Sequence, residues 1–158
     1  MTEHIATVQW QRNQAKFVDN QYSRQHTWLF DGGLAVPASA SPHLVPVPYA
    51  EPVSIDPEEA FIAALSSCHM LWFLSIAAQQ KFVVEQYRDE AIGSMGKNAE
   101  GKLAITQVCL RPLVLFEGDR QPTPEQLEAL HQDAHHRCFL ANSVKTEITI
   151  ETVSAYPL

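Results

Sequence analysis

The chain has 158 residues, of which 46% are hydrophobic and 18% are charged, and its formal net charge is −7. This length and composition are typical of one folded domain with a substantial core, and they exclude a disordered chain. Nucleic acids and anionic membranes select basic surfaces, so the acidic balance argues against both as the main partner. We therefore expect a single domain over residues 1–158 that binds neither nucleic acid nor membrane.

The cysteines and the first residues indicate the compartment. Residues 1–4 lack a basic run followed by an apolar one, so we expect no signal peptide. The three cysteines are Cys68, Cys109 and Cys138. An odd number without a secretion signal indicates a reducing, cytoplasmic compartment rather than a framework of structural disulfides. Any disulfide in this chain is then expected to be transient and part of its chemistry.

The N-terminal third is expected to be extended and irregular. Residues 5–10 alternate and predict a strand, residues 17–30 predict a second extended region, and residues 34–36 predict a short strand. An Asp-Gly-Gly turn signal at 31–33 separates the last two. Residues 37–53 contain five prolines, which lack a backbone N–H and fix φ, so we expect a loop there.

A long helix is predicted over residues 56–80. Asp56 can cap its first N–H groups, Pro57 suits its first position, and Glu59 lies three residues after the cap. Almost all residues from 60 to 78 are apolar. A helix that is apolar on all sides is expected to be buried on all sides.

This helix is also long enough to be weighed as a membrane span. It is rich in alanine, carries His69 and three serines, and lacks basic flanks apart from Lys81 and Arg88 on one side. These features argue against a membrane span. We therefore expect a core helix with Cys68 at its middle.

The C-terminal half is expected to combine strands with a second helix. Residues 82–116 predict strands that are bulged or ended at Pro112 and arranged as an antiparallel meander. Residues 123–138 predict a helix capped by Thr123, and residues 145–153 alternate as a closing strand. The predicted fold class is α+β, with antiparallel strands packed on a long buried central helix and a shorter second helix.

Cys68 has two interpretations, a small buried hydrophobe or a reactive thiol. Its neighbours Ser66, Ser67 and His69 are polar inside a helix that otherwise excludes polarity, and buried polar groups need partners. A reactive thiol needs its thiolate form, which nearby positive charge favours. Cys68 lies about three turns into the helix, beyond the range of the helix dipole, so a positive charge must come from elsewhere.

Other candidate residues are favoured as structural. His131, His135 and Cys138 recur at i, i+4 and i+7 of the second helix, which suits either a metal site or a solvated polar face. We favour the polar face because no fourth ligand motif stands out. Cys109 is interpreted as packing in a sheet. Arg24, between aromatic residues of an extended segment, is more often a packed or paired arginine than a catalytic one.

The chain resembles the OsmC/Ohr family of hydroperoxide-reducing proteins over nearly its full length. The motifs that carry this resemblance are Asp-Pro-Glu-Glu-Ala-Phe-Ile-Ala-Ala-Leu-Ser-Ser-Cys-His-Met at 56–70 and His-Arg-Cys-Phe-Leu-Ala-Asn-Ser-Val-Lys at 136–145. The segments at 22–33 and 38–42 are similar to an OsmC-like branch rather than to Ohr proper. The resemblance implies an intertwined homodimer whose two long helices are buried at its centre, with the active sites at the subunit boundary.

The resemblance also implies catalytic roles. Cys68 matches the thiol that attacks the peroxide, and Cys138 matches the resolving thiol. Glu58, ten residues before Cys68, matches the acid that holds an activating arginine through charge-assisted hydrogen bonds. Arg24 is the best match for this arginine, and Arg12 is the reserve.

The implied reaction is a thiol peroxidase cycle in defence against oxidative stress. The thiolate attacks the O–O bond and becomes a sulfenic acid, an alcohol leaves, and the second thiol condenses to a disulfide. An external dithiol, lipoyl-type in family members, then reduces the disulfide, and no metal, haem or flavin is required. Phe61, Trp72, Phe139 and His69 are the expected substrate-binding residues. The apolar character of Phe61, Trp72 and Phe139 favours organic hydroperoxides, and equal rates with hydrogen peroxide would contradict this preference.

Two other functions remain open at this stage. The first is a non-catalytic small-molecule or stress-response binding protein on the same scaffold. Cys68 and Cys138 would then be too far apart to bridge, with Cα atoms beyond about 7 Å. The second is a cysteine hydrolase with His69 as the base. Adjacent helix residues point about 100° apart, so His69 does not easily reach the Cys68 sulfur.

Overall fold

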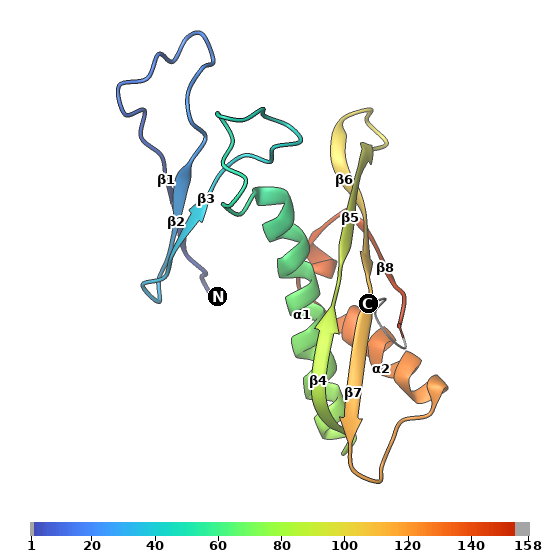
Figure 1. Cartoon of the computed structure of the whole chain (residues 1–158). Coiled ribbons are helices and arrows are strands. Elements are labelled where there is room, and N and C mark those ends of the chain that lie inside the picture. The colour runs from blue at the N-terminus through green and yellow to red at the C-terminus, as the bar shows by residue number, and fades with distance from the viewer. Residues whose placement is uncertain (1, 154–158) are drawn as a thin grey trace. The chain divides into compact units, whose positions relative to one another are not determined.

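The computed structural model describes residues 2–153 and divides into two compact units, one up to Ala60 and one from Phe61 onward (Figure 1). Within these residues the chain forms eight strands, two α-helices and one short 3₁₀ helix. The mixture of helices with antiparallel sheets confirms the predicted α+β class. The single domain expected over residues 1–158 stays a prediction.

The N-terminal unit is built on a small antiparallel sheet. Its strands, in spatial order, are β1 (Ala6–Gln9), β2 (His26–Phe30) and β3 (Ala35–Ala38). The strands predicted at 5–10 and 34–36 are thus confirmed within a few residues. Gly33 takes the positive φ of 85° at the turn before β3, a conformation that glycine adopts without steric cost. Pro37, expected in the loop, lies in β3 instead, because an edge strand tolerates a missing N–H.

The extended region predicted over 17–30 is wrong for its first part, since only β2 forms a strand there. The aromatic side chains of this region pack on one another rather than on a sheet. The Tyr22 ring centroid lies 4.7 Å from that of Phe17 and 5.4 Å from that of Trp10. The backbone turns through a positive φ of 61° at Asn20, which a continuous strand excludes.

The central helix α1 (Pro57–Gln79) confirms the helix predicted over 56–80. The Glu59 N–H donates to the Asp56 carboxylate at 2.8 Å, and the Asp56 N–H donates to the Glu59 carboxylate at 3.3 Å. This reciprocal pair satisfies two backbone donors at the helix start, so local sequence alone fixes where α1 begins. By length and composition α1 could cross a membrane, which is weak evidence because core helices pass the same test.

Burial of α1 differs from the expectation, because only one face of the helix is buried in the single chain. Leu71 on the opposite face is 61% exposed, and Ser67 and Ser75, one turn to either side, are exposed as well. The buried residues recur at helical spacing and are Leu65, His69, Phe73, Ile76 and Ala77. The expectation that α1 is buried on all sides is therefore wrong for one chain taken alone.

The C-terminal unit pairs its strands in two sheets. β5 pairs antiparallel with β6, and β4 pairs antiparallel with β7. β8 pairs in parallel with β6, a pairing that the expected antiparallel meander does not include. The elements are β4 (Val83–Asp89), β5 (Ile92–Lys97), β6 (Leu103–Leu110), β7 (Pro112–Glu117), α2 (Pro124–Arg137), the 3₁₀ helix η1 (Ala141–Ser143) and β8 (Glu147–Ile150).

A carboxylate bridges the point where these strands break. β4 ends at Asp89, and β6 and β7 are separated at Arg111, directly before the predicted break at Pro112. The Asp89 carboxylate accepts a hydrogen bond from the Arg111 N–H at 2.6 Å and another from the Ser66 hydroxyl on α1. The Asp89 side chain thus replaces a backbone hydrogen bond between strands and also connects the strands to the central helix.

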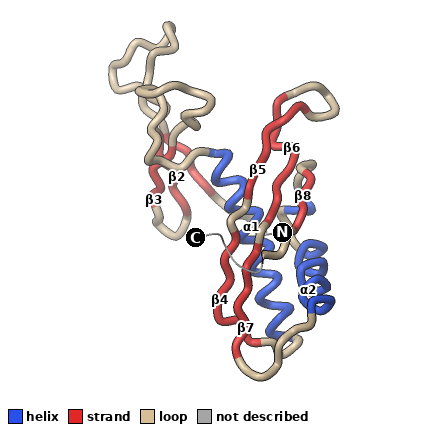
Figure 2. Tube along the Cα trace, turned by 45° about the vertical axis from the view of Figure 1, so that its right-hand side comes forward, coloured by secondary structure: helices blue, strands red, loops and turns tan. Residues whose placement is uncertain are grey.

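The second helix α2 begins as the sequence predicts. The Gln126 N–H donates to the Thr123 hydroxyl at 3.2 Å, and the Thr123 N–H donates to the Gln126 side chain at 2.9 Å. This capping box fixes the start of α2. Figure 2 shows α1 and α2 together on one side of the strands of this unit.

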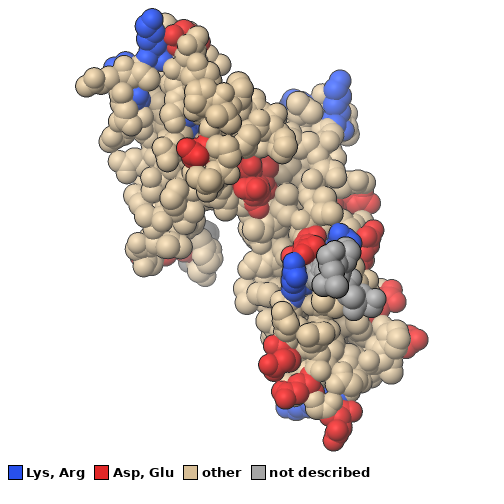
Figure 3. Space-filling model, in the orientation of Figure 1, with Lys and Arg blue, Asp and Glu red and all other residues tan. Residues whose placement is uncertain are grey.

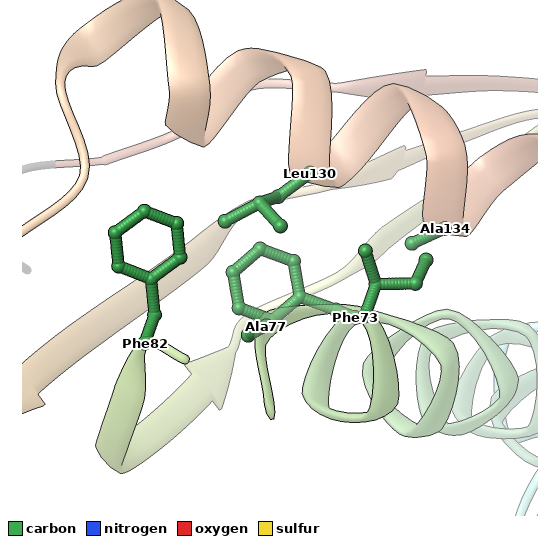
Figure 4. Close-up of a cluster of buried hydrophobic side chains, with 6 residues drawn as sticks. Phe73, Ala77, Phe82, Leu130 and Ala134 are labelled. Carbon is green, nitrogen blue, oxygen red and sulfur yellow. The ribbon is translucent and has the colours of Figure 1, made fainter. Parts of the chain in front are cut away.

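Two apolar clusters form the core of the C-terminal unit. One lies between α1 and α2 and over β4 and β7 (Figure 4). Its buried residues are Phe73, Ile76, Ala77, Phe82, Leu130 and Ala134. The other consists of Leu65, Val108 and Leu110 and connects α1 with β6. The first cluster holds α2 against the half of α1 that follows Cys68, which positions the site described below.

Charge is spread over the surface without a dominant basic region on the face shown in Figure 3. Lys and Arg side chains lie there in small separate groups, and Asp and Glu side chains are more numerous. The net charge of −7 agrees with this distribution. That face therefore offers no extended basic patch to a polyanion.

Candidate active site

Two cysteine thiols meet between α1 and α2. Cys68 lies in the middle of α1 and is half-buried, whereas Cys138 is the C-terminal cap of α2 and is only 1% exposed. The two thiols are close enough to interact, and both are free. The prediction that these residues work together thus has the necessary contact.

The two thiols have different environments. Burial, together with a smaller effect of the neighbouring Cys68 thiol, raises the pKa of Cys138 to about 11. The Ala141 N–H donates to the Cys138 sulfur at 3.4 Å, so η1 closes over this thiol. At neutral pH Cys138 is therefore a buried, protonated thiol, and Cys68 is the more accessible sulfur of the pair.

An aromatic pair lies beside the thiols. Trp72 is one helical turn after Cys68, and its ring meets that of Phe139 edge-on with 5.5 Å between centroids. Phe139 directly follows Cys138 and is 69% exposed. The Arg137 guanidinium lies over the Trp72 ring at 5.9 Å and pairs with Asp133, one turn before it. This surface combines an apolar platform with a cation.

Of the remaining two predicted substrate residues, Phe61 is partly buried and His69 is buried. Phe61 packs against the cluster of Leu65, Val108 and Leu110. His69 is only 1% exposed, so a single chain offers a substrate almost none of its surface. Of the four predicted substrate residues, Phe139 is exposed and Trp72 is half-buried in contact with it, and both lie beside the thiols.

His69 instead pairs with a residue that the sequence did not connect to it. Its Nε2 lies 3.0 Å from Nδ1 of His131, and the two rings are nearly parallel at 6°. His131 is 2% exposed and also stacks on Phe73, with 4.3 Å between centroids. The favoured interpretation of His131 as part of a solvated face is therefore wrong. The polar residue inside the α1 sequence was the only signal of this pair, and it did not identify the partner.

Both imidazoles are neutral. Burial, with a smaller contribution from the nearby His135, lowers the pKa of His69 to about 4. Burial, with a smaller contribution from His69, lowers the pKa of His131 to about 3. One ring therefore donates an N–H and the other accepts it, as two neutral imidazoles allow.

The metal site considered at His131, His135 and Cys138 finds no geometric support. Nδ1 of His131 is occupied by His69. Among residues 2–153, no three His, Cys, Asp or Glu side chains are grouped so that they could hold a metal ion.

The predicted activating groups lie in the N-terminal unit and are not paired there. The Arg24 guanidinium donates to the Asn20 side chain at 2.6 Å and to the backbone carbonyls of Asn20 and Tyr22, and it covers the Tyr22 ring at 3.8 Å. Glu58 has a buried carboxylate oxygen with no hydrogen-bond partner among the described residues. Arg12 donates to the carbonyl of Ala15 in an exposed loop. The Arg24–Glu58 pair therefore stays a prediction.

Cys109 lies apart from this site. It is a half-buried residue of β6, as expected for sheet packing. Burial raises the pKa of its thiol, and Thr149, Glu151 and Arg111 surround it. None of these residues belongs to the thiol pair or to its aromatic platform.

Comparison with known proteins agrees with the geometry. The sequence model of the family described as OsmC-like protein matches residues 51–153. A solved OsmC-like protein of unknown function from Vibrio cholerae is 58% identical, with 97% of this chain and 100% of that chain covered and a TM-score of 0.95. No curated protein matches the chain.

Two more distantly related structures show only that the fold is shared. One is an organic hydroperoxide resistance protein, OsmC, from Legionella pneumophila, with 19% identity, 96% of each chain covered and a TM-score of 0.67. The other is the organic hydroperoxide resistance protein OhrB of Bacillus subtilis, with 17% identity, 96% of this chain and 98% of that chain covered and a TM-score of 0.68. The family match spans well over half of the sequence and includes both cysteines of the pair, and the chain therefore belongs to the OsmC-like protein family.

Proposed function

We propose that the protein is a thiol-dependent peroxidase that reduces organic hydroperoxides to alcohols in defence against oxidative stress. The observation that carries this proposal is the contact between the half-buried Cys68 thiol and the buried, protonated Cys138 thiol. The names of the Legionella and Bacillus proteins support a role in organic hydroperoxide resistance. The non-catalytic alternative requires thiols too far apart to bridge, and their contact does not favour it.

In the proposed reaction Cys68 acts first. Its thiolate sulfur attacks one peroxide oxygen, an S–O bond forms while the O–O bond breaks, and the alkoxide leaves as an alcohol after taking a proton. Cys68 is thereby oxidised to a sulfenic acid. Its exposure and its position beside Trp72 and Phe139 support this order, because an organic peroxide can rest on that apolar platform.

Cys138 acts second. Its sulfur attacks the sulfenic sulfur, the S–S bond forms, and the thiol proton leaves with the hydroxyl group as water. The raised pKa of Cys138 supports this role, because a protonated thiol does not compete for the peroxide. An external dithiol, for which a lipoyl-type group is our expectation, then reduces the disulfide and restores both thiols.

Chemical mapping tests both steps. After one equivalent of cumene hydroperoxide, mass spectrometry is expected to find a Cys68–Cys138 disulfide and a free Cys109. In Cys138→Ser the same treatment is expected to leave a sulfenic acid on Cys68, which dimedone captures. Free thiols at both positions after oxidant treatment of the wild-type protein would contradict the proposal.

The proposal includes a homodimer, in which a second copy covers the open face of α1. That face consists of small side chains around the 61% exposed Leu71, and close approach of two such helices would bury it. The carboxylate oxygen of Glu58 that is buried without a hydrogen-bond partner among residues 2–153 supports a cationic partner for it in the assembly, and Arg24 is the predicted one. The activating charge for Cys68 would then be completed at the subunit boundary.

Replacing Leu71 with glutamate tests the dimer. A charge buried without a partner at the centre of an interface is expected to weaken association by at least about 100-fold, or roughly 3 kcal/mol. Sedimentation equilibrium should show a wild-type dimer and a Leu71→Glu monomer. Leu103→Glu is the matched control, since Leu103 is 71% exposed on β6 and is expected to leave the dimer intact. A wild-type protein that sediments as a monomer at micromolar concentration would refute this part of the proposal.

A further inference from the structure

The geometry points to His69 and His131 as positioning residues whose hydrogen bond fixes the register in which α2 presents Cys138 to Cys68. This inference deepens the proposed function and rests on it for the consequence in peroxide reduction. The placement of the two pairs rests on the structure alone. Neither histidine needs to touch the substrate or the reacting sulfurs in this role.

The two pairs connect the same two helices. His69 directly follows Cys68 on α1, and His131 precedes Cys138 by seven residues, which is two turns of α2 and the same face of that helix. On α1 the two contacts are adjacent, whereas along α2 they lie about 10 Å apart, at 1.5 Å per residue. A slide or rotation of α2 that breaks one contact therefore displaces the other.

Most of the contacts around the histidine hydrogen bond between α1 and α2 are apolar, so this bond is the one that depends on direction. Next to it the helices meet through Phe73, Ile76, Ala77, Leu130 and Ala134. Apolar packing is favourable in several registers because it is non-directional, while a hydrogen bond requires one donor, one acceptor and a narrow range of angles. A single buried polar pair is known to specify register in helix assemblies for this reason.

His131 is also fixed from a second side. Its ring stacks on Phe73, one turn after His69 on α1, at 27° between the planes. The ring of His131 thus contacts two successive turns of α1, and little freedom remains for it to rotate. Both histidines are more than 95% buried, so water does not compete for their shared hydrogen bond.

The expected consequence falls on one chemical step. A disulfide forms only when the Cα atoms lie within about 4.4–6.8 Å and the Cβ vectors face each other. A shift of α2 by one residue moves Cys138 about 1.5 Å along the helix and turns it by about 100°. Attack of Cys68 on hydrogen peroxide, which does not rest on the apolar platform at Phe139, does not depend on α2 register, whereas condensation with Cys138 depends on it directly.

Two substitutions at His131 distinguish the effect of its hydrogen bond on helix register from the effect of its volume on packing. His131→Asn keeps a polar amide atom close to the position of Nδ1 and can still bond to Nε2 of His69. His131→Leu fills the site with apolar atoms and cannot. We expect condensation to slow by at least about tenfold in His131→Leu, since small misplacements of reacting groups cost this much or more. His131→Asn is expected to recover most of that loss.

The two steps are measured separately. Attack is followed with hydrogen peroxide, which does not rest on the Phe139 platform, as dimedone-reactive sulfenic acid in the Cys138→Ser background. Condensation is followed as disulfide formation in proteins that keep Cys138. His131→Leu is expected to change the attack rate by less than about twofold, because the Cys68 environment on α1 is retained. Condensation in His131→Leu at the wild-type rate, or equal slowing of both steps, would overturn the inference.

A redox titration keeps this inference distinct from the proposed function. The equilibrium between the Cys68–Cys138 dithiol and its disulfide in a glutathione buffer requires no peroxide. We expect the disulfide to be at least about tenfold less favoured in His131→Leu than in the wild type and to be restored in His131→Asn. An unchanged equilibrium overturns the positioning role even if the peroxidase proposal holds. A changed equilibrium supports it even if no sulfenic acid forms.

The double variant His69→Leu/His131→Leu tests whether a loss of stability, rather than a change of register, explains slow condensation. Replacing both partners of a buried polar pair with apolar groups is often neutral or stabilising, while removing one leaves the other unsatisfied. The double variant is therefore expected to unfold at a denaturant concentration near or above that of His131→Leu and still to condense slowly. Recovery of the wild-type condensation rate in this variant would show that stability, not register, sets the rate.

Discussion

Cys68→Ser is expected to abolish hydroperoxide reduction, with at least about a thousandfold loss of turnover. A serine hydroxyl stays protonated at neutral pH and cannot accept the peroxide oxygen to form a sulfenic acid. The measurement is cumene hydroperoxide consumption with a small dithiol as reductant. Serine and cysteine have similar volumes, so the variant should fold and should show a thermal midpoint close to that of the wild type.

Cys109→Ser is the matched control for this loss. Its thiol lies on β6 among Thr149, Glu151 and Arg111, away from the pair between α1 and α2. We expect its turnover to stay within about twofold of the wild type, as for a residue with no contact to the reacting groups. Substantial turnover by Cys68→Ser would mean that another thiol attacks the peroxide. The proposed assignment of Cys68 would then be wrong.

The helices were predictable because their ends are encoded locally. Asp56 with Glu59 and Thr123 with Gln126 form reciprocal caps within three residues of sequence, and the structure shows both. No long-range contact is needed to fix these starts. The same logic explains the turn at Gly33, where only local backbone freedom matters.

The strands were less predictable because distant residues set their ends and partners. The break after β4 depends on Asp89, whose carboxylate binds the Arg111 N–H and the Ser66 hydroxyl, residues 22 and 23 positions away. The parallel pairing of β8 with β6 depends on how the chain returns after α2. Alternation of apolar residues carries no information on either point.

In the candidate site, too, local features were predictable from the sequence and long-range contacts were not. Cys68 and Cys138 were linked by family resemblance, and the structure brings their thiols into contact. His69 was recognised as a polar residue in an apolar helix, but its partner depends on the register of α2. His131 was assigned to a solvated face because its spacing with His135 suggested one exposed stripe. His131 is buried against Phe73, unlike His135, and sequence spacing alone could not reveal this difference.

The buried imidazole pair is expected to make the fold sensitive to mild acid. In the unfolded chain a histidine has a pKa near 6.5, while burial lowers that of His69 to about 4 in the folded protein. Between these values the unfolded state binds more protons, so the free energy of unfolding falls as the pH falls. The contribution of His69 is fully present above about pH 6.5, and about 3 kcal/mol of it is lost by about pH 4.

Urea denaturation at pH 7.0, 5.5 and 4.5 measures this loss. Carboxylates also respond in this range, so the decisive quantity is the difference between the wild type and His69→Leu/His131→Leu. The double variant lacks both imidazoles and should lose distinctly less stability on acidification. His136→Gln is the control, because His136 is exposed at the end of α2 and should leave the wild-type slope unchanged. Parallel curves for the wild type and the double variant would mean that the pair is not buried and neutral in solution. The same acid step should loosen α2 where it holds Cys138, so protonation would oppose disulfide formation before the fold is lost.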